Sequence, residues 1–535
     1  MASYNRENLV RDLHRILKRT PRQTKYDLQE ALATLDWDIT TSQINSVLYG
    51  YRDLFEHGGE SLPVWRATHY MPVSKTRRTV PPKTSDLSYY RGPSPREWQQ
   101  EAFEAWQAAG RRGVIEAVTG TGKTTVGILA AADAAARDLR IMIVVPGLDL
   151  LDQWYRKLTE ELPALSVGKF GGGHKDSLEN HRIVVSTVQS ASRWRMLPGG
   201  MPGLLVADEV HRYGAESFAL ALEDEFDERL GLTATYERED KGIEHHLRPY
   251  FKPNERQHRV KGEVVAHCDY ARGLADGILA HFRVGLLGVN FTPDEQDEYQ
   301  ELDDQARRTR GHLINAHDCP AEPFGEFMKA VTVLSEGNNE DPQGTGRARQ
   351  YLNAFSKRRA LLADCRHKLT ALETLSRVLS AANRAIVFTE TVQSAEQAAI
   401  LLRDLGIYAE DYTSALSRKE RIERLEQFRI GRIQVLAAPK VLDEGIDVPE
   451  ADVGIIVAAS RSRRQMIQRM GRIIRPKTDG RPATFFVLYV RETAEDPDLG
   501  AHSSFLSEMN DNADEIEYFP SDINPQQLLH WYRSR

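Results

Sequence analysis

The segment from Glu116 to Thr125 places two glycines, a lysine and several threonines between two apolar stretches. Residues 113–115 are apolar and predict a buried strand, while residues 126–137 are rich in alanine and predict a helix. A glycine-rich turn between a strand and a helix is the context in which a chain cradles phosphates. Gly120 and Gly122 let backbone N–H groups turn inward, and the helix N-terminus adds its dipole. The segment therefore predicts a phosphate-binding loop.

Individual side chains of this loop have expected tasks. Lys123 is expected to reach the β- and γ-phosphates of ATP, and the Thr124 hydroxyl is expected to ligate Mg2+. Ala117 stands where the usual pattern has its first glycine, so a plain strand–helix turn with a capping threonine is the alternative. The residues expected to contact the nucleotide here are Thr119, Gly120, Thr121, Gly122, Lys123, Thr124 and Thr125.

The length of the chain exceeds what one hydrophobic core supports. Its 535 residues predict two to four domains. No run of eighteen apolar residues occurs, and the first residues lack the order of a signal peptide, so no membrane partner is expected. The three cysteines are far apart and suit a reducing compartment, so a cytoplasmic location is expected.

Residues 1–70 predict a small module of their own. Apolar residues recur at helical spacing over 8–18, 24–35 and 41–51, and a hairpin pattern with a turn at 57–59 follows. Three short helices and a hairpin are typical of a winged helix-turn-helix, in which the third helix enters the major groove of DNA. Residues 1–90 carry 13 Lys/Arg against 10 Asp/Glu, which supports DNA only mildly, and a module for protein contact is the alternative.

Two further regions alternate short apolar strands with helices, as parallel α/β domains do. The first spans 95–285 and follows a proline-rich, basic linker over 71–94; the second spans 381–490. The expected strands are 113–117, 141–145, 182–186, 203–207 and 229–232 in the first region, and 385–388, 407–409, 433–437, 453–458 and 484–489 in the second.

The remaining segments do not alternate. Residues 286–380 predict a helical insertion, with a charged helix from Pro293 to Arg310, a flexible loop over 335–346 and one long helix over 347–379. The long helix has a basic face that either is solvated or lies along DNA. Residues 491–535 hold ten Asp/Glu against three Arg, and predict an acidic tail that could bind a protein partner.

A pair of carboxylates follows the apolar run over 204–207. In an open parallel sheet, ligands bind at the carboxyl ends of strands. Asp208 is therefore expected to hold Mg2+ opposite Thr124, and Glu209 to polarise the attacking water. We infer ATP hydrolysis from these residues together with the phosphate loop.

Residues 208–211 (Asp-Glu-Val-His) resemble the signature of DEAD/DEAH-type superfamily-two helicases and translocases. Seven further segments resemble other motifs of that family in the family order, at 96–99, 145–147, 186–189, 232–235, 386–390, 442–449 and 468–476. The resemblance spans about 95–490 and implies two tandem RecA-like domains that bind ATP and Mg2+. It further implies adenine recognition by Gln99, nucleotide contacts by Gly445 and Asp447, and nucleic-acid or coupling roles for Pro146, Thr187, Gln189, His211, Thr233, Thr235, Thr389 and Arg469.

The last of these motifs carries the arginines that hydrolysis needs. Arg472 and Arg475 are three residues apart and would share one face of a helix. An arginine supplied from outside the phosphate loop stabilises the charge that develops in phosphoryl transfer, by roughly 10³–10⁵ in rate. Because both lie in the second domain, hydrolysis is expected only when the domains close. Gln468 is expected to form a polar bridge with His211.

The triplet Arg238-Glu239-Asp240 is similar to one in helicases of the xeroderma pigmentosum group B type, which act on DNA. This resemblance implies a DNA motor that moves 3′ to 5′, with a thumb-like insertion within 286–375. Two alternatives stay open: an RNA helicase, and a DNA-binding remodelling subunit of a larger complex in defence or repair. No cluster of nuclease carboxylates is seen in the sequence, so DNA cleavage would need a partner.

Overall fold

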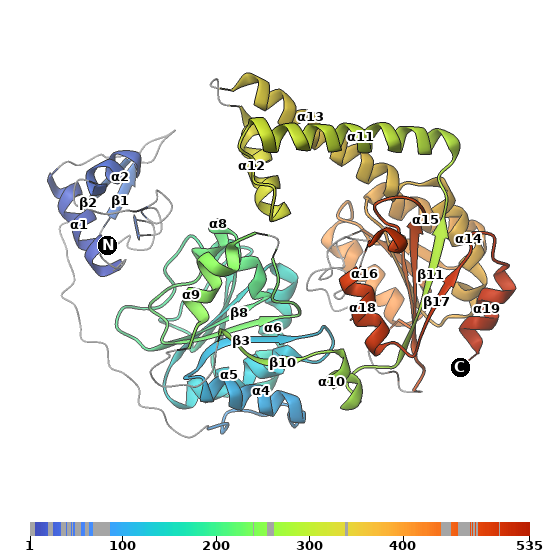
Figure 1. Ribbon diagram of the computed structural model, residues 1–535. Helices are drawn as coiled ribbons and strands as arrows, with labels where there is room; N and C mark the ends of the chain where they lie inside the picture. The colour runs from blue at the N-terminus through green and yellow to red at the C-terminus, as the bar shows by residue number, and fades with distance from the viewer. Residues whose placement is uncertain are drawn as a thin grey trace. The chain divides into compact units, whose positions relative to one another are not determined.

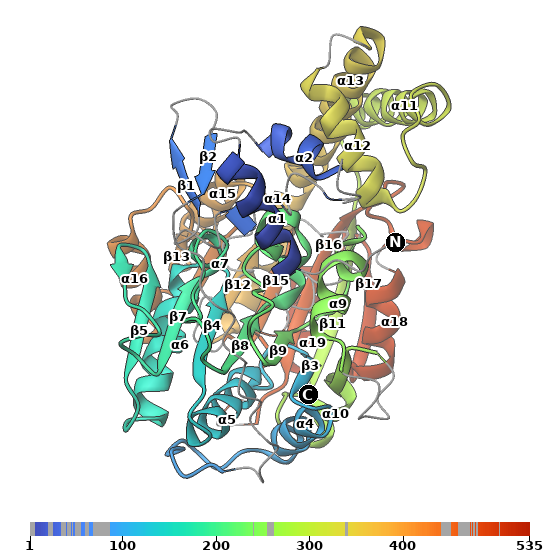
Figure 2. The same cartoon turned by 90° about the vertical axis from the view of Figure 1, so that its left-hand side faces the viewer.

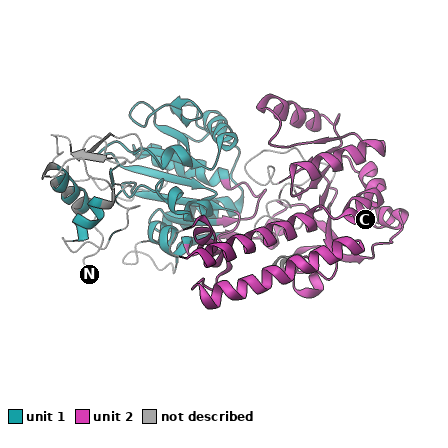
Figure 3. Cartoon of the chain, turned by 90° about the horizontal axis from the view of Figure 1, so that it is seen from above, with its two compact units in different colours: residues 1–115, 124–233, 242–266 teal, residues 116–123, 234–241, 267–535 magenta. Residues whose placement is uncertain are grey.

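The computed structural model describes the motor region almost completely and the N-terminal module in part. The described residues are 6–19, 25–33, 39, 44, 47–48, 55–58, 64–67, 86–238, 240–253, 262–337, 341–439, 451–457, 471, 473–474, 477, 480–501 and 503–534. The chain divides into two compact units, one of residues 1–115, 124–233 and 242–266, the other of 116–123, 234–241 and 267–535 (Figure 3).

The first sheet has eight strands in the order β10-β3-β9-β8-β4-β7-β5-β6. Its strands are β3 (Arg112–Ala117), β4 (Arg140–Val145), β5 (Val167–Gly171), β6 (His174–Lys175), β7 (Ile183–Thr187), β8 (Gly203–Asp208), β9 (Glu228–Thr233) and β10 (Val264–Cys268). All five expected strands are confirmed, whereas β5, β6 and β10 were not expected. Strands β7, β8 and β9 are buried along their whole length, as strands covered on both faces are.

Helices connect these strands, as the alternating pattern predicts (Figure 1). They are α4 (Glu97–Ala108), α5 (Lys123–Ala136), α6 (Leu148–Glu161), α7 (Val188–Ala191), α8 (Glu216–Ala219), the 3₁₀ turn η1 (Val210–Gly214), the π-helical η2 (Ile243–Leu247) and α9 (Arg248–Phe251). The helix α5 begins directly at the phosphate loop and is buried from Val126 to Ala135, which explains its alanine-rich sequence.

The second sheet has seven strands in the order β13-β14-β12-β15-β16-β11-β17. Its strands are β11 (Phe282–Val289), β12 (Ala385–Phe388), β13 (Ala409–Asp411), β14 (Val435–Ala438), β15 (Val453–Ile456), β16 (Ala483–Val490) and β17 (Glu515–Phe519). Its helices include α10 (Tyr270–Ala275), α14 (Arg366–Ala381), α15 (Val392–Asp404), α16 (Arg418–Arg429), α18 (Ser503–Asn512) and α19 (Pro525–Arg533), with the 3₁₀ turn η4 (Pro497–Leu499). The chain thus contains two α/β sheets built mainly of parallel strands, with a helical region between them in the sequence. This confirms the expected α/β fold.

Strand β11 corrects the expected boundary between the first domain and the insertion. It pairs in parallel with β16 on one side and with β17 on the other (Figure 2). A boundary at 285/286 therefore falls inside a strand of the second sheet. The run from Phe282 to Val289 is apolar except for Arg283, and it is fully buried, so its sequence carries a strand signal that the expected boundary overlooked.

The helical insertion consists of α11 (Pro293–Ala316), α12 (Phe324–Glu336) and α13 (Pro342–Ala363) around a core of their own. The loop expected over 335–346 is wrong at both ends, because α12 continues to Glu336 and α13 starts at Pro342. Asp341 caps α13 by accepting a hydrogen bond from the Gly344 N–H, and Pro342 suits the first turn. The single long helix expected over 347–379 is also wrong, because Asp364 and Cys365 separate α13 from α14.

The segment over 491–535 is part of the second sheet rather than an acidic tail. Strand β17 extends that sheet, and α19 shares a hydrophobic core with α14. Arg283 forms an ion pair with Glu515 and donates to the Trp531 carbonyl oxygen at 2.7 Å. Its guanidinium lies 4.2 Å from the centre of the Trp531 ring. The acidic composition of the segment concealed the strand signal, because Glu515 pairs with Arg283 and Glu517 is exposed to solvent.

The described part of the N-terminal module contains the expected helices and hairpin, but the turn expected at 57–59 is wrong at its start, because His57 and Gly58 belong to the first strand of the hairpin. It contains α1 (Arg6–Arg19), α2 (Lys25–Ala33) and an antiparallel pair of β1 (Phe55–Gly58) and β2 (Val64–Ala67). Ten buried apolar residues form its own core. The third expected helix is described only at Ile44, Val47 and Leu48, which are helical. Most of the linker, residues 71–85, lies outside the described residues.

Within the described ranges, every helix is too short or too polar to traverse a lipid bilayer.

Candidate functional site

The phosphate loop has the backbone conformation that its glycines predict. Gly120 and Gly122 have φ angles of 96° and 88°, in a region that residues with a side chain rarely adopt. The Thr121 hydroxyl is buried and donates to the Val118 carbonyl oxygen at 2.8 Å. Lys123 Nζ donates to the Ala117 carbonyl oxygen at 2.6 Å, so the ammonium group lies over the loop itself.

Glu116 and His267, which sequence reasoning did not identify as site residues, lie at the base of this loop. A Glu116 carboxylate oxygen accepts the Tyr236 N–H at 2.8 Å, and the other lies 3.3 Å from His267 Nδ1. The Val118 N–H donates to the Cys268 carbonyl oxygen at 2.9 Å. The segment after β9 is thus tied to the strand that precedes the phosphate loop. A glutamate at the end of an apolar strand, immediately before the loop, was the signal that could have identified Glu116.

Asp208 and Glu209 lie where β8 ends. Asp208 is buried, and its Oδ2 accepts a hydrogen bond from Trp154 Nε1 at 2.8 Å. Its Oδ1 accepts the Glu209 N–H at 3.0 Å. Glu209 has φ 50° and ψ 50°, a left-handed conformation that is uncommon for a residue other than glycine. Such conformations cost energy and concentrate at functional sites.

The phosphate loop and the carboxylates follow the same edge of one sheet. Strand β8 runs parallel to β9. Strand β9 lies between β8 and β3, and the Arg229 N–H donates to the Arg111 carbonyl oxygen. A Cβ at Gly231 would lie 3.0 Å from Val114, so residue numbers rise together along β3 and β9, which are therefore parallel. The carboxyl ends of all three strands share one edge, the place where open α/β sheets bind ligands.

His211 and Thr233, both predicted, are brought together at this edge. His211 Nδ1 and Thr233 Oγ1 are 2.9 Å apart, and both side chains are buried. His211 Nδ1 is also 3.5 Å from a Glu209 carboxylate oxygen. The contact joins the end of β8 to the end of β9, so a displacement of one strand end moves the other. Thr235, two residues further, is buried as well.

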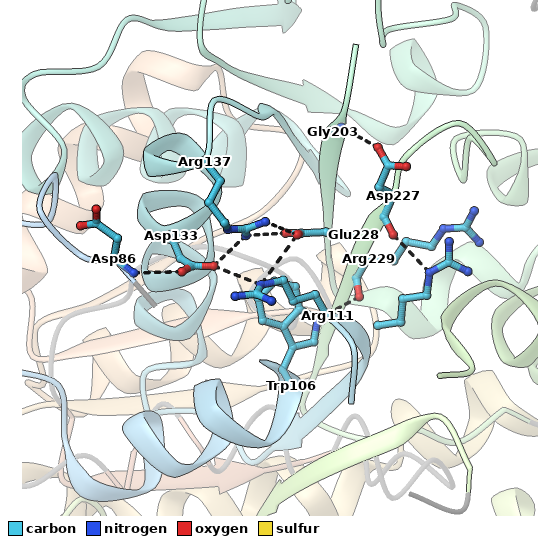
Figure 4. A network of polar contacts seen from close by, with 10 residues as sticks. Asp86, Trp106, Arg111, Asp133, Arg137, Gly203, Asp227, Glu228 and Arg229 are labelled. Carbon is cyan, nitrogen blue, oxygen red and sulfur yellow. Dashed lines mark hydrogen bonds and ion pairs between the residues drawn. The ribbon is translucent and has the colours of Figure 1, made fainter. Parts of the chain in front are cut away.

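A buried polar network anchors the opposite end of the same strands (Figure 4). Arg137, at the end of α5, forms ion pairs with Asp133 and Glu228. Arg111 joins the network through Asp133 at 3.2 Å. Burial raises the pKa of Glu228, although the adjacent Arg137 guanidinium acts in the opposite direction. The network fixes the far end of α5 against β9, so the helix that carries Lys123 has a rigid base.

Three residues predicted to contact nucleic acid lie at the ends of β4 and β7. Gln189 Nε2 donates to the Pro146 carbonyl oxygen at 3.3 Å. Thr187 caps α7, with its hydroxyl oxygen accepting the Ser190 N–H. Because β4 runs parallel to both β7 and β8, the residues that follow β4 and β7 lie at the same edge of the sheet as Asp208.

The other predicted residues occupy separate places. Gln99 is buried, and its side-chain oxygen accepts the Arg96 N–H at 2.9 Å, which caps α4. Arg238 and Asp240 form two hydrogen bonds of 2.6 Å with each other. The Thr389 hydroxyl, after β12, donates to the Thr391 carbonyl oxygen at 3.3 Å. The predicted residues that lie outside the described ranges are Glu239, Gly445, Asp447, Gln468, Arg469, Arg472 and Arg475.

The basic side chains expected on one long helix are largely engaged within the protein. Arg358 pairs with Asp303 of α11, and Arg359 lies 2.5 Å from Glu390. Lys368 is buried and donates to Glu495 at 2.8 Å. Lys368 therefore cannot belong to a DNA-facing surface, and two of the arginines hold helices in place.

Comparison with known proteins agrees with this geometry. Residues 93–238 match the family described as "Type III restriction enzyme, res subunit", and residues 368–477 match the "Helicase conserved C-terminal domain". The "DNA 3'-5' translocase XPB2" of Sulfurisphaera tokodaii is 30% identical over 385 residues, which are 71% of this chain and 79% of that protein. The "DNA 3'-5' helicase XPB" of Mycobacterium tuberculosis is 26% identical over 425 residues, which are 77% of this chain and 64% of that protein.

A solved structure shares the fold. Saccharomyces cerevisiae Dbp5 bound to RNA and ADP BeF3 superposes with a TM-score of 0.51 at 14% identity, covering 82% of this chain and 93% of that one. At this identity the likeness concerns the fold alone. The relative from Sulfurisphaera tokodaii, in contrast, is similar enough in sequence to assign this chain to a family. The chain belongs to the superfamily-two helicases, among relatives of the XPB type.

Proposed function

We propose that this protein is an ATP-dependent DNA motor that moves 3′ to 5′, as a translocase or a helicase. The observation that carries the proposal is the shared sheet edge, where the phosphate loop follows β3 and the Asp208-Glu209 pair follows β8, with only β9 between these two strands. The curated relatives add the substrate, because both are described as 3'-5' enzymes of DNA.

The residues of the first sheet fit a magnesium-bound nucleotide. Mg2+ prefers oxygen ligands and is usually held by one or two carboxylates together with substrate phosphates. Asp208 and the Thr124 hydroxyl supply such oxygens, and the described residues contain no cluster of three or more His, Cys, Asp or Glu that would suit an all-protein metal cage. When bound, the ion neutralises charge on the β- and γ-phosphates. We assign binding of the same phosphates to Lys123 and the loop N–H groups, and recognition of the adenine to Gln99.

We assign orientation of the attacking water to Glu209. Its backbone is left-handed, and one of its carboxylate oxygens lies 3.5 Å from His211 Nδ1. The contact between His211 and Thr233 passes any shift of this carboxylate to β9 and the segment beyond it. Arg472 and Arg475 supply positive charge from the second domain, and Gly445 and Asp447 complete the nucleotide contacts. Hydrolysis then depends on domain closure.

The remaining assignments concern DNA. Pro146, Thr187, Gln189 and Thr389 contact the backbone of one strand, a grip that is sequence-tolerant and sensitive to salt. We propose that residues 1–70 form a winged helix that binds duplex or recruits a partner protein, and that 71–94 tether it. The helical insertion over α11–α13 is the thumb-like element.

One measurement tests the proposal: phosphate release with duplex DNA, single-stranded DNA, RNA or no nucleic acid. DNA is expected to stimulate turnover and RNA is not. Equal stimulation by RNA would favour the RNA helicase, and tight DNA binding without turnover would favour a remodelling subunit. Duplexes with a 3′ or a 5′ tail then give the direction, because a 3′ to 5′ motor unwinds or displaces only from the 3′ tail.

The Lys123→Ala variant tests the site itself. Loss of the ammonium group is expected to abolish DNA-stimulated turnover, because no other group of the loop carries a positive charge to the phosphates. Lys175→Ala is the matched control, since this lysine is exposed on the short β6 hairpin. Turnover at the wild-type rate in Lys123→Ala would refute the assigned site.

A further inference from the structure

Trp154 donates a hydrogen bond from its indole N–H to Asp208 Oδ2 at 2.8 Å. The side chain is only 1% exposed and comes from α6, a helix that begins at Leu148, directly after Pro146 and Gly147. The second oxygen of Asp208 accepts the Glu209 N–H at 3.0 Å. Each carboxylate oxygen thus has a donor from a different element, which fixes both the rotation and the tilt of the group.

The phosphate-loop helix holds the ring of Trp154 in place. A Cβ added at Gly127, one turn into α5, would lie 2.6 Å from Trp154 Cη2 and 3.2 Å from Leu232 Cδ1. Only glycine allows the helix to approach the ring this closely. The indole therefore fills the space between α5 and the end of β8, and its N–H cannot move without moving the helix that starts at Lys123.

The chemistry of the indole suits this task. Its N–H is a donor only and does not titrate, so it can donate to the carboxylate at every physiological pH. An ionised carboxylate has about four lone-pair positions, so two hydrogen bonds leave capacity for a cation. Partners of a metal ligand that fix its orientation typically contribute a factor of roughly 10–100 in metal affinity.

We propose that Trp154 is a positioning residue for the magnesium-bound nucleotide: it orients the Asp208 carboxylate and links it to α5 and α6. This inference rests on the proposed role of Asp208 as a metal ligand. It adds a residue that touches neither nucleotide nor metal and acts through another side chain. Because α6 begins at the segment proposed to contact DNA, the same indole connects that segment to the carboxylate.

The test is Trp154→Phe, which removes the N–H and keeps most of the ring. Trp106→Phe is the matched control, because Trp106 is also fully buried and donates its N–H at 3.0 Å, but to the Arg229 carbonyl oxygen (Figure 4). Mn2+ binding is measured by electron paramagnetic resonance with a non-hydrolysable ATP analogue, and analogue binding is measured without metal. Thermal melting of each variant reports the structural cost.

Trp154→Phe is expected to weaken Mn2+ affinity roughly tenfold or more while metal-free analogue binding stays near the wild-type value. Trp106→Phe is expected to change Mn2+ affinity less than about twofold, whatever its melting temperature. Equal Mn2+ affinities in the two variants would overturn the inference. Asp208→Asn tests the metal-ligand assignment separately from the role of Trp154. If this variant keeps the wild-type Mn2+ affinity, Asp208 is not a metal ligand. If it loses Mn2+ affinity, Asp208 is supported as a ligand, and the Trp154 variant then decides the role of Trp154.

A second variant serves if Trp154→Phe does not fold. Gly127→Ala keeps the indole but adds a methyl group where the ring lies, which displaces the N–H from Asp208. Its Mn2+ affinity is expected to fall several-fold. An unchanged affinity in a folded Gly127→Ala protein counts against the inference.

Discussion

At the scale of single residues, the site depends on a few atoms that are held from several directions. Asp208 receives hydrogen bonds from Trp154 and from the Glu209 N–H, and Glu209 adopts a strained backbone conformation. Preorganised groups of this kind lower the barrier without reorganising during the reaction. The strained backbone at Glu209 supports the proposal that this carboxylate takes part in the reaction, because such conformations concentrate at functional sites.

Glu209→Gln tests this role. The amide keeps the size of the side chain but loses the charge that orients water, so turnover is expected to fall by roughly 10²–10⁴ with nucleotide binding retained. Single-turnover phosphate release and equilibrium binding of an ATP analogue measure the two effects. Glu216→Gln, an exposed carboxylate in the first turn of α8, is the control and is expected to behave as wild type. A Glu209→Gln protein with normal turnover would remove Glu209 from the reaction.

At the scale of elements, buried carboxylates fix loops whose sequences give no regular pattern. Glu223 is 5% exposed and accepts the Met196 N–H at 2.7 Å, which holds the loop between α7 and β8. Its backbone carbonyl oxygen accepts the Tyr250 hydroxyl at 2.8 Å. Burial raises the pKa of Glu223 to about 7, while the hydrogen bonds from Met196 and Leu197 act to lower it.

This raised pKa predicts a pH dependence of stability. Between about pH 4.5 and 7 the folded protein keeps the Glu223 proton that the unfolded chain releases, so this group's contribution to stability falls as the pH rises and levels off above about 7. In Glu223→Gln the contribution is absent. The difference in melting temperature, wild type minus variant, is expected to decrease from pH 5 to pH 8. A difference that is constant or increases with pH would contradict the assignment.

Arg283 links β17 and α19 to β11 through its side chain. Arg283→Met removes donors to Glu515 and to the Trp531 carbonyl oxygen, and is expected to cost about 2–3 kcal/mol of unfolding free energy. Most of this cost comes from the carbonyl oxygens of Trp531 and Ser534, because the Glu515 side chain is 40% exposed and partly screened. Urea denaturation measures it. Arg308→Met, whose guanidinium is 81% exposed beside Asp304, is the control and is expected to cost less than about 0.5 kcal/mol.

At the scale of the whole molecule, the N-terminal module, the insertion and the second sheet each have a core of their own among the described residues. The N-terminal module packs ten apolar residues such as Leu13 and Leu28 among themselves, and the insertion and the second sheet have separate clusters. A chain built in this way tolerates loss of one part better than a single core would. The parallel strands and connecting helices of each sheet form the two α/β domains, and the smaller parts are the ones that we propose to contact DNA or a partner protein.

Deletion of residues 1–85 tests the module. Because its core is self-contained, basal ATP hydrolysis is expected to stay within about twofold of the full chain. Affinity for duplex DNA, measured by fluorescence anisotropy at fixed salt, is expected to fall by roughly tenfold as phosphate contacts are lost. Unchanged duplex affinity would assign the module to a protein partner instead.

The sequence predicted this fold wherever a local pattern was sufficient. The strands that end at Ala117 and Asp208 were predicted because apolar runs led into chemical motifs, and the turn at Gly120 because only glycine suits it. Strand β17 was not predicted, because its charged residues depend on Arg283 for a partner more than 200 positions away. Trp154 was not predicted either, because an indole that bonds to a carboxylate 54 positions away looks like a core residue in the sequence.

The placement of β11 has a consequence for synthesis of the protein. This strand is buried on both faces between β16 and β17, and Arg283 lies 232 positions before Glu515. At roughly 5–20 residues per second, a ribosome needs roughly 10–50 s to make that interval. This strand, which is apolar except for Arg283, therefore has neither β16 nor β17 beside it on the nascent chain while the insertion and the strands β12 to β15 are made. The yield of folded protein in a cell depends on what covers that strand during the delay.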